Sequence, residues 1–214
     1  MLTGQKAINY WENNTYLDIK KLNCLELGSR KGGLSLWLAL KGNQVICSDL
    51  NSPEEKAKEM HNKYGLANNI TYQSINAAKI PFQNEFDIVV FKSILGSICR
   101  NGNDKLKKEV IDGIYTSLKP GGKLLFAENL NSSFLHQFFR KKFTNWGSKW
   151  NYLTYNETAH LFSSFSKTDY ITVGFFGAFG RSEKQRNFLG KIDQVIGKLI
   201  PKSSKYILIG IAEK

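Results

Sequence analysis

One segment of this 214-residue chain constrains the fold more than any other. It begins with the apolar run Cys24–Leu27, continues through the glycine-rich stretch Gly28–Gly33, and is followed by a second apolar run, Val45–Asp49. This order predicts a buried strand, a tight turn that opens a helix, and a second strand that ends at a carboxylate. An open α/β sheet uses this arrangement to hold a nucleoside-containing cofactor. Asp49 lies 21 residues after Gly28, where a carboxylate can accept hydrogen bonds from two ribose hydroxyls.

Strand and helix patterns alternate along the first 130 residues. The run Phe86–Phe91 is apolar and β-branched, which is typical of a central parallel strand buried on both faces. Strands that alternate with helices imply right-handed crossovers and a doubly wound α/β sheet. The predicted strands are 22–27, 44–48, 70–73, 86–91, 123–128, 169–175 and 205–212. The predicted helices are 5–17, 32–40, 52–64, 104–118, 154–164 and 183–199.

The alternation stops after Glu128. Residues 129–156 are irregular, aromatic and basic, so we expect a small cap inserted after the fifth strand. The length suits one larger domain, and we expect residues 1–214 to form it. Its core would comprise about residues 20–130 and 157–214, and its cap about residues 129–156 together with helix 5–17.

The composition favours a folded protein of a reducing compartment. Hydrophobic residues make up 42% of the chain, which is enough for a core and excludes wholesale disorder. The three cysteines show no C-x-x-C spacing, so we expect neither a disulfide framework nor a metal site. The first residues are too polar for a signal peptide, and no apolar run approaches the roughly 20 residues that span a bilayer. We therefore expect a cytoplasmic protein.

The formal charge of +12 is unevenly distributed. Residues 131–214 contain ten lysines and three arginines against five acidic residues, a net +8. A basic C-terminal portion favours an anionic partner, which could be nucleic acid, a phospholipid surface or a phosphorylated substrate. The alternative is a basic protein whose charges are spread over solvated surfaces.

The glycine-rich turn by itself fits several adenosine cofactors. A dinucleotide motif G-x-G-x-x-G aligned on Gly28 needs glycine at the position of Arg30. Three further motifs follow in order, at 74–82, 85–90 and 117–126, the last of which contains Leu-Lys-Pro-Gly-Gly. With these motifs, residues 20–130 resemble the class I S-adenosylmethionine-dependent methyltransferases, in particular the branch that acts on small molecules and lipids.

The resemblance implies a Rossmann-like sheet of seven strands, mostly parallel with an antiparallel C-terminal strand. It implies S-adenosylmethionine as the cofactor and S-adenosylhomocysteine as the product. Gly28, Ser29 and Gly32 would form the turn around the methionine part of the cofactor. Glu26 would orient this turn or meet the cofactor's ammonium group through a water, and Asp49 would accept from both ribose hydroxyls. Alternatively, Glu26 and Asp49 are simply exposed carboxylates at strand ends.

Residues that follow the next strands would complete the cofactor site. Leu50 would pack on the adenine, Asn76 would bond to its amino group, and Ala77 would offer a backbone amide to the ring. Phe91 and Lys92 would face the methionine carboxylate or the sulfonium. Asn76 could instead be an ordinary turn residue, and Lys92 a peripheral one.

Arg30 departs from the family pattern, which usually has glycine at this position. Either the backbone takes a conformation open to side chains, or the Arg30 side chain reaches the cofactor carboxylate or an anionic substrate. We expect Arg30→Gly to retain affinity for S-adenosylmethionine and to lose acceptor turnover. A large rise in the cofactor's dissociation constant with normal turnover at saturation would contradict this hypothesis.

The methyl group of a sulfonium is already electrophilic, so a general base is needed only for a hydroxyl or a protonated amine. His136, in the cap where acceptors usually bind in this family, and Glu128, which ends the fifth strand, are the two candidate bases. His61 and His160 fall in helices and are expected to be surface or packing residues.

The segment 134–152 of the cap is strongly aromatic and basic. Arg140, Trp146, Trp150 and Tyr152 are the candidate acceptor-binding residues. Such residues can stack on sugars while binding a phosphate, lie in a membrane interface, or stack on nucleotide bases. They can also form a lid whose aromatic rings pack on the sheet. The amphipathic helix 187–199 covers a sheet face or attaches to a membrane.

We favour transfer of a methyl group to a small-molecule acceptor or a glycan, including one carried on a lipid. The motifs also resemble bacterial methyltransferases of surface-polysaccharide biosynthesis, which would allow peripheral contact with an anionic membrane at its inner face. Methylation of RNA is the first alternative, motivated by the charge, although no separate RNA-binding module is visible. A methyltransferase-like partner subunit without catalysis is the second alternative.

Overall fold

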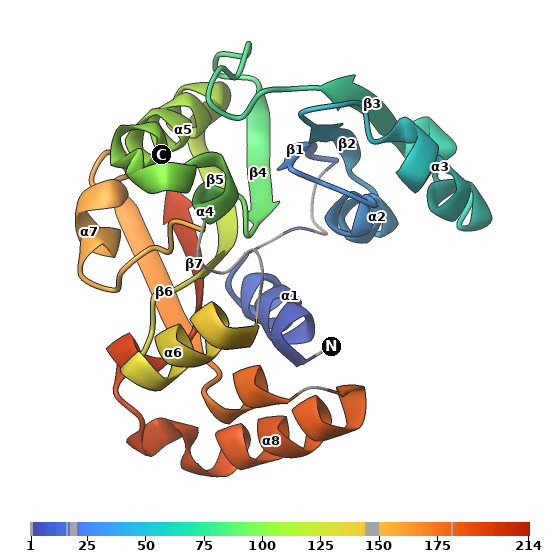
Figure 1. Cartoon of the computed structure of the whole chain (residues 1–214). Coiled ribbons are helices and arrows are strands. Elements are labelled where there is room, and N and C mark those ends of the chain that lie inside the picture. The colour runs from blue at the N-terminus through green and yellow to red at the C-terminus, as the bar shows by residue number, and fades with distance from the viewer. Residues whose placement is uncertain (1, 16, 18–20, 144–149, 181) are drawn as a thin grey trace.

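The computed structural model describes residues 2–15, 17, 21–143, 150–180 and 182–214 (Figure 1). These residues contain one seven-stranded sheet in the order β3-β2-β1-β4-β5-β7-β6. The strands from β1 to β5 run parallel, and β7 lies antiparallel between β5 and β6. The predicted doubly wound sheet with an antiparallel C-terminal strand is therefore confirmed. The strands are β1 (Asn23–Leu27), β2 (Gln44–Asp49), β3 (Ile70–Ser74), β4 (Phe86–Lys92), β5 (Leu118–Asn129), β6 (Lys167–Val173) and β7 (Ile207–Glu213).

Helices cover both faces of the sheet and bury one hydrophobic cluster on each (Figure 1). Helices α4, α5 and α7 cover one face, and α1, α2 and α3 cover the other. The buried apolar residues of β4 supply alternate side chains to both clusters, as expected for a central parallel strand. The helices are α1 (Leu2–Asn14), α2 (Gly33–Leu40), α3 (Glu54–Lys63), α4 (Leu95–Ile98), α5 (Asp104–Ser117), α6 (Phe134–Phe143), α7 (Glu157–Leu161) and α8 (Glu183–Ile196).

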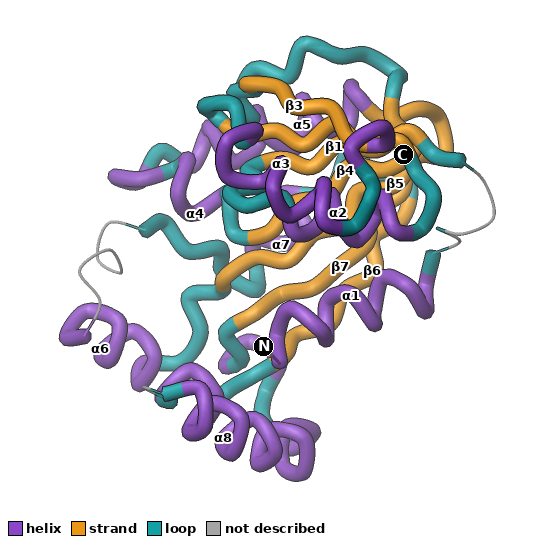
Figure 2. Tube along the Cα trace, turned by 90° about the vertical axis from the view of Figure 1, so that its right-hand side faces the viewer, coloured by secondary structure: helices purple, strands orange, loops and turns teal. Residues whose placement is uncertain are grey.

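The N-terminal helix α1 lies against the last strand of the chain (Figure 2). The indole Nε1 of Trp11 donates a hydrogen bond of 3.1 Å to the carbonyl of Gly210 in β7. The Trp11 ring is fully buried, and its centroid lies 5.7 Å from that of Trp37 in α2. Two elements from opposite ends of the sequence are thus joined at the edge of the site described below.

The cap differs from the irregular segment that we expected, because residues 134–143 form helix α6. Both α6 and α8 pack on the short 3-10 helix Phe176–Phe179 at one end of the molecule (Figures 1 and 2). Asp193 of α8 fixes this segment, because its carboxylate accepts from the backbone amides of Phe175, Phe176 and Gly177. The helix predicted at 183–199 therefore does not cover a sheet face.

Three further boundaries differ from the prediction for local reasons. The strand predicted to begin at residue 123 starts at Leu118, since the turn-like sequence Lys119–Gly122 is accommodated as an irregularity beside β4. Gly121 permits it by adopting a φ of 74°. The helix predicted at 154–164 shortens to α7, and α8 ends at Ile196 before a 3-10 turn. No helix within the described ranges combines the length and apolarity needed to cross a bilayer.

Candidate functional site

The turn between β1 and α2 contains three residues in the left-handed region: Gly28 (φ 65°), Arg30 (φ 54°) and Gly32 (φ 69°). The backbone amide of Ser29 donates to the carbonyl of Ser48, which ties the turn to β2. Arg30 therefore keeps the backbone conformation that glycine would adopt, at a cost of about 1–2 kcal/mol for a residue with a Cβ. Of the two expectations for Arg30, a backbone open to side chains is wrong. Its exposed side chain lines the cavity described below.

Glu26 connects β1 to the start of α2. Its Oε2 accepts hydrogen bonds from the backbone amide of Ser35 at 2.8 Å and from the Ser35 hydroxyl at 2.5 Å. Burial raises the pKa of the Glu26 carboxyl to about 7, because the charged form loses its water. The prediction that Glu26 orients the turn agrees with these contacts, whereas an exposed strand-end carboxylate does not, since Glu26 is 3% exposed.

Asp49 lies at the carboxyl end of β2, beside the turn. One of its oxygens accepts from the backbone amide of Arg30 at 3.0 Å, and the other accepts from the amide of Leu50 at 2.8 Å. These bonds hold the carboxylate in one orientation. Each oxygen can accept a further hydrogen bond, since a carboxylate oxygen has two lone pairs. Asp49 is partly exposed and can therefore meet a ligand.

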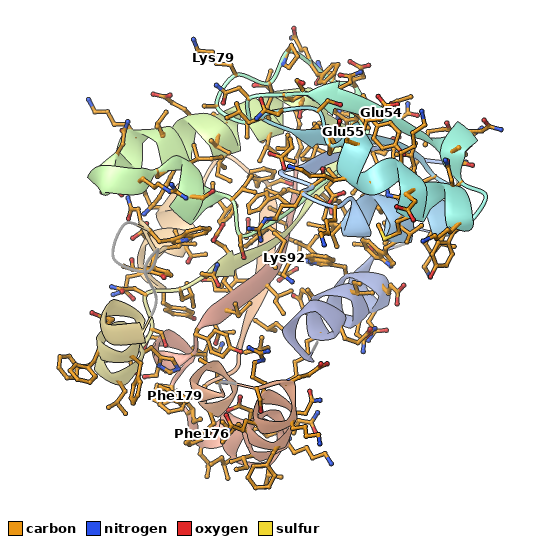
Figure 3. All side chains as sticks on the ribbon, turned by 45° about the vertical axis from the view of Figure 1, so that its right-hand side comes forward. Glu54, Glu55, Lys79, Lys92, Phe176 and Phe179 are labelled. Atoms are coloured by element: carbon orange, nitrogen blue, oxygen red, sulfur yellow. The ribbon has the colours of Figure 1, made fainter. Side chains whose placement is uncertain are left out.

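A cavity of about 670 Å³ opens at the carboxyl ends of β1, β2 and β4. This volume lies in the range of small-molecule sites. It brings together seven of the residues predicted from the sequence: Glu26, Gly28, Ser29, Arg30, Asp49, Lys92 and Trp150. Figure 3 shows Lys92 beside α1 near the middle of the molecule.

Two walls of this cavity were not foreseen as part of the site. Helix α1 contributes Ile8 and Trp11, and the segment after β4 contributes Ile94 and Arg100. The apolar spacing of α1 predicts a buried face, but nothing local in the sequence says that this face borders the turn. Trp150 closes the opposite side by lying directly over Gly96 of α4, where a Cβ would approach its Nε1 to 1.7 Å.

Five of the predicted cofactor residues do not line this cavity: Gly32, Leu50, Asn76, Ala77 and Phe91. Gly32 instead packs on His61 of α3, whose Nε2 lies 2.9 Å from the Gly32 carbonyl. Leu50 is exposed beyond Asp49. Asn76 is exposed and its side chain accepts from the amide of Ala78, and Ala77 is buried in the core.

The Phe91 prediction needs a correction. Its side chain is fully buried in the core and stacks on Phe126 of β5 with a centroid distance of 6.2 Å. Side chains along β4 point alternately to the two faces of the sheet, and the Phe91 ring points into the core on one face. The ring therefore cannot face the methionine part of a cofactor. The next residue, Lys92, is exposed and lines the cavity.

Neither candidate base lines the cavity. Glu128 is fully buried, its two carboxylate oxygens accept from the backbone amides of Leu95 and Asn129, and burial raises its pKa to about 7. His136 is also buried, and its Nε2 donates to the carbonyl of Phe175 at 2.9 Å. These contacts position α4 and α6 and leave neither group directed at an acceptor.

The remaining cap residues divide into three groups. Trp150 lines the cavity, and the Tyr152 ring lies beside the Trp150 ring, with 6.4 Å between their centroids. Arg140 belongs to α6, but its side chain lies outside the described residues. Trp146 lies outside them altogether.

Residues 25–126 match the family model described as a methyltransferase domain. Similar curated proteins include the ubiquinone/menaquinone biosynthesis C-methyltransferase UbiE of Pseudoalteromonas translucida, which is 41% identical over 88 residues. That match covers 40% of this chain and 32% of the relative. UbiE of Francisella tularensis is 37% identical over 111 residues, covering 50% of this chain and 42% of the relative. The chain thus spans less than half the length of these relatives.

Solved structures share the fold over nearly the whole chain. A SAM-dependent methyltransferase from Methanosarcina mazei has a TM-score of 0.67 at 19% identity and covers 95% of each chain. The Haemonchus contortus phosphoethanolamine N-methyltransferase 2, in complex with phosphomonomethylethanolamine and S-adenosylhomocysteine, has a TM-score of 0.68 at 17% identity. That match covers 98% of this chain and 52% of the other. These structures confirm the Rossmann-like fold predicted from the sequence, and the match of residues 25–126 agrees with the predicted resemblance to methyltransferases.

Proposed function

We propose that this chain, of which residues 25–126 match a methyltransferase domain, is a class I S-adenosylmethionine-dependent methyltransferase that transfers a methyl group from that cofactor to a small-molecule acceptor. One observation carries the proposal: the turn, Asp49 and Lys92 line a single cavity at the carboxyl ends of three neighbouring strands. This is the edge at which open α/β sheets bind ligands.

The residues of the cavity fit the cofactor. Ser29 has a buried hydroxyl that finds no hydrogen-bond partner among the described residues, and a polar group of a ligand can supply one. Gly28 lets the turn pack against Ile94 in the cavity wall, since a Cβ there would approach Cγ2 of Ile94 to 2.5 Å. Asp49 would hold the ribose, and Glu26 would keep the turn in place. The cofactor's sulfonium supplies an electrophilic methyl group.

The protein's contribution to the reaction is alignment and exclusion of water. Trp11 and Trp150 belong to two sides of the cavity wall. These residues would hold the acceptor's nucleophilic atom in line with the methyl carbon, which it would bond as the sulfur kept the electron pair of the broken bond. Glu26 and Asp49 are the carboxylates among the described lining residues, and both are engaged by backbone amides. We therefore propose that the acceptor binds in a form that is already nucleophilic.

The acceptor class that we propose is a small molecule or a glycan, including a lipid-linked one, as in surface-polysaccharide biosynthesis. Aromatic and aliphatic side chains of α1, Ile94 and Trp150 suit a ring or an alkyl group. RNA is the alternative that the charge suggests. A quinone precursor is a further candidate, motivated by the similarity to UbiE proteins.

Binding and transfer can be tested separately. Calorimetry with S-adenosylhomocysteine should show binding by the wild type, and a protein that serves only as an empty scaffold would give no heat. Transfer of radiolabel from S-adenosylmethionine is then measured on lipid, sugar, quinone-precursor and RNA fractions. Labelling of RNA alone would overturn the proposed acceptor class. Labelling of none of the fractions by a protein that binds the cofactor would favour the non-catalytic subunit.

We also propose that α6 and α8 contact an anionic membrane at its inner face. Eleven large hydrophobic side chains are exposed among the described residues, and seven of them lie on or directly after these two helices. They are Phe134, Leu135, Phe138, Phe139, Phe188, Val195 and Leu199. Exposed cations of α8 and the turn after it, Lys184, Arg186, Lys191 and Lys198, accompany them. Apolar side chains beside cations match the requirements of an interfacial helix on anionic lipid.

Vesicle sedimentation tests this surface. The wild type should sediment with vesicles that contain phosphatidylglycerol and should sediment less with pure phosphatidylcholine. The double variant Phe134→Ser/Phe188→Ser should lose most of this binding. Leu40→Ser is the matched control, because Leu40 is 56% exposed on α2, away from these helices. Equal sedimentation of the wild type and the double variant would refute the proposed contact.

A further inference from the structure

Three cationic side chains line the cavity: Arg30, Lys92 and Arg100. They come from the turn after β1, from the end of β4, and from the 3-10 turn after α4. Each is exposed, and none forms an ion pair with any residue that the structure describes. The described part of the chain therefore leaves three positive charges at one cavity without neutralising partners.

The carboxylates of the cavity do not balance these charges. Glu26 is buried with a pKa raised to about 7, so that it is only partly ionised near neutral pH. Asp49 lies at the end of β2, and β1 separates it from Lys92 at the end of β4. S-adenosylmethionine contributes a sulfonium and an ammonium group against one carboxylate. With the cofactor in place, the cavity keeps an excess of positive charge, which attracts anions.

The excess of positive charge is concentrated on the side of the cavity away from Asp49. The ammonium of Lys92 lies 3.5 Å from the position that a Cβ on Gly4 would occupy, and so contacts the first turn of α1. The amide groups at a helix N-terminus also carry positive partial charge. Arg100 lines the same cavity, which Trp150 borders as well. Lys92 and Arg100 thus both offer positive charge to an anion in this cavity.

We infer that the acceptor carries an anionic oxygen group, a phosphate or a carboxylate, and that Lys92 and Arg100 bind this group. The inference rests on the proposed methyltransferase function and assigns the acceptor's chemical class. Arg30 then remains for the cofactor's own carboxylate, beside the turn that holds the methionine part. Charge-assisted hydrogen bonds from ammonium and guanidinium groups are the strong class of such contacts. They would fix the acceptor's orientation while the apolar wall receives its ring or chain.

The test uses protein saturated with S-adenosylhomocysteine and titrated with inorganic pyrophosphate or succinate as probes for the two anion classes. Lys92→Gln and Arg100→Gln should each raise the dissociation constant of the preferred anion about tenfold, the effect expected for a lost charged hydrogen bond. Their affinity for S-adenosylhomocysteine should stay within about twofold of the wild type, which also shows that the variants are folded. Lys79→Gln is the matched control, since Lys79 is exposed far from Lys92 (Figure 3).

The outcomes distinguish failure of the proposed function from failure of the inferred acceptor class. If S-adenosylhomocysteine does not bind, the proposed function fails, whatever the anions do. If it binds but neither anion does, or if Lys79→Gln weakens anion binding as much as the other two variants, the inference about the acceptor fails. Once a labelled fraction is found, phosphatase treatment should abolish methylation of a phosphorylated acceptor, and carbodiimide amidation that of a carboxylated one. Full methylation after both treatments would also overturn the inference.

Discussion

Replacing Gly28 by alanine should destabilise the protein for two reasons. The φ of 65° at this position costs a residue with a Cβ about 1–2 kcal/mol. The new Cβ would approach Cγ2 of Ile94 to 2.5 Å, and overpacking of this kind costs about 1–3 kcal/mol. The free energy of unfolding should fall by about 2–5 kcal/mol, which corresponds to a loss of roughly 4–20 °C in melting temperature at this chain length.

Gly33→Ala provides the matched control within the same turn. Gly33 is the first residue of α2, and a Cβ there would meet no atom within 4 Å. Alanine should therefore leave the stability unchanged or raise it by up to about 1 kcal/mol through its helix propensity. Urea unfolding followed by circular dichroism measures both variants. An unfolding midpoint for Gly28→Ala equal to the wild type, or an equal loss in Gly33→Ala, would refute the reasoning.

Three further variants test other parts of the site. Trp11→Phe removes the donor to the Gly210 carbonyl and should lower the free energy of unfolding by about 1–3 kcal/mol; a variant as stable as the wild type in urea would contradict this role. Glu26 binds its proton more tightly in the folded state, with a pKa of about 7 against an ordinary 4.5, so its contribution to stability should fall by about 3 kcal/mol as the pH rises through this window. Glu26→Gln should make the free energy of unfolding in urea depend less on pH. Some dependence should remain, since Glu128 contributes a slope of the same sign, and an unchanged profile would contradict the argument. Asp49→Asn should raise the dissociation constant of S-adenosylhomocysteine at least about tenfold by calorimetry, because a carboxylate accepts from two ribose hydroxyls more strongly than an amide does; unchanged affinity would remove Asp49 from the cofactor site.

The sheet could be predicted from the sequence because its signals are local. Runs such as Phe86–Phe91 carry enough apolar and β-branched residues to identify a buried strand, and the glycine turn marks the start of α2. The ends of the elements were less accurate, as the start of β5 shows. There a glycine with a positive φ lets the strand continue through a sequence that is typical of a turn.

The parts of the site that the sequence did not predict depend on contacts between distant residues. Trp150 meets Gly96, and Trp11 meets Gly210, at separations that no local pattern records. The local sequence pattern also does not show in which direction a buried polar group points. Glu128 and His136 were candidate bases because of their positions along the chain, yet their polar atoms bond to nearby backbone and hydroxyl groups.

The docking of α1 on β7 bears on how the protein is made. The strand that accepts the hydrogen bond of Trp11 contains Gly210, which the ribosome synthesises 199 residues after Trp11. While these residues are being synthesised, α1 has no β7 on which to fold, and the wall that it contributes to the cavity is missing. The nascent chain can pair β1 with β2 and β4 before that moment. Closure of this side of the cavity therefore requires β7, and a shortened chain without β7 would keep the glycine turn but lose this wall.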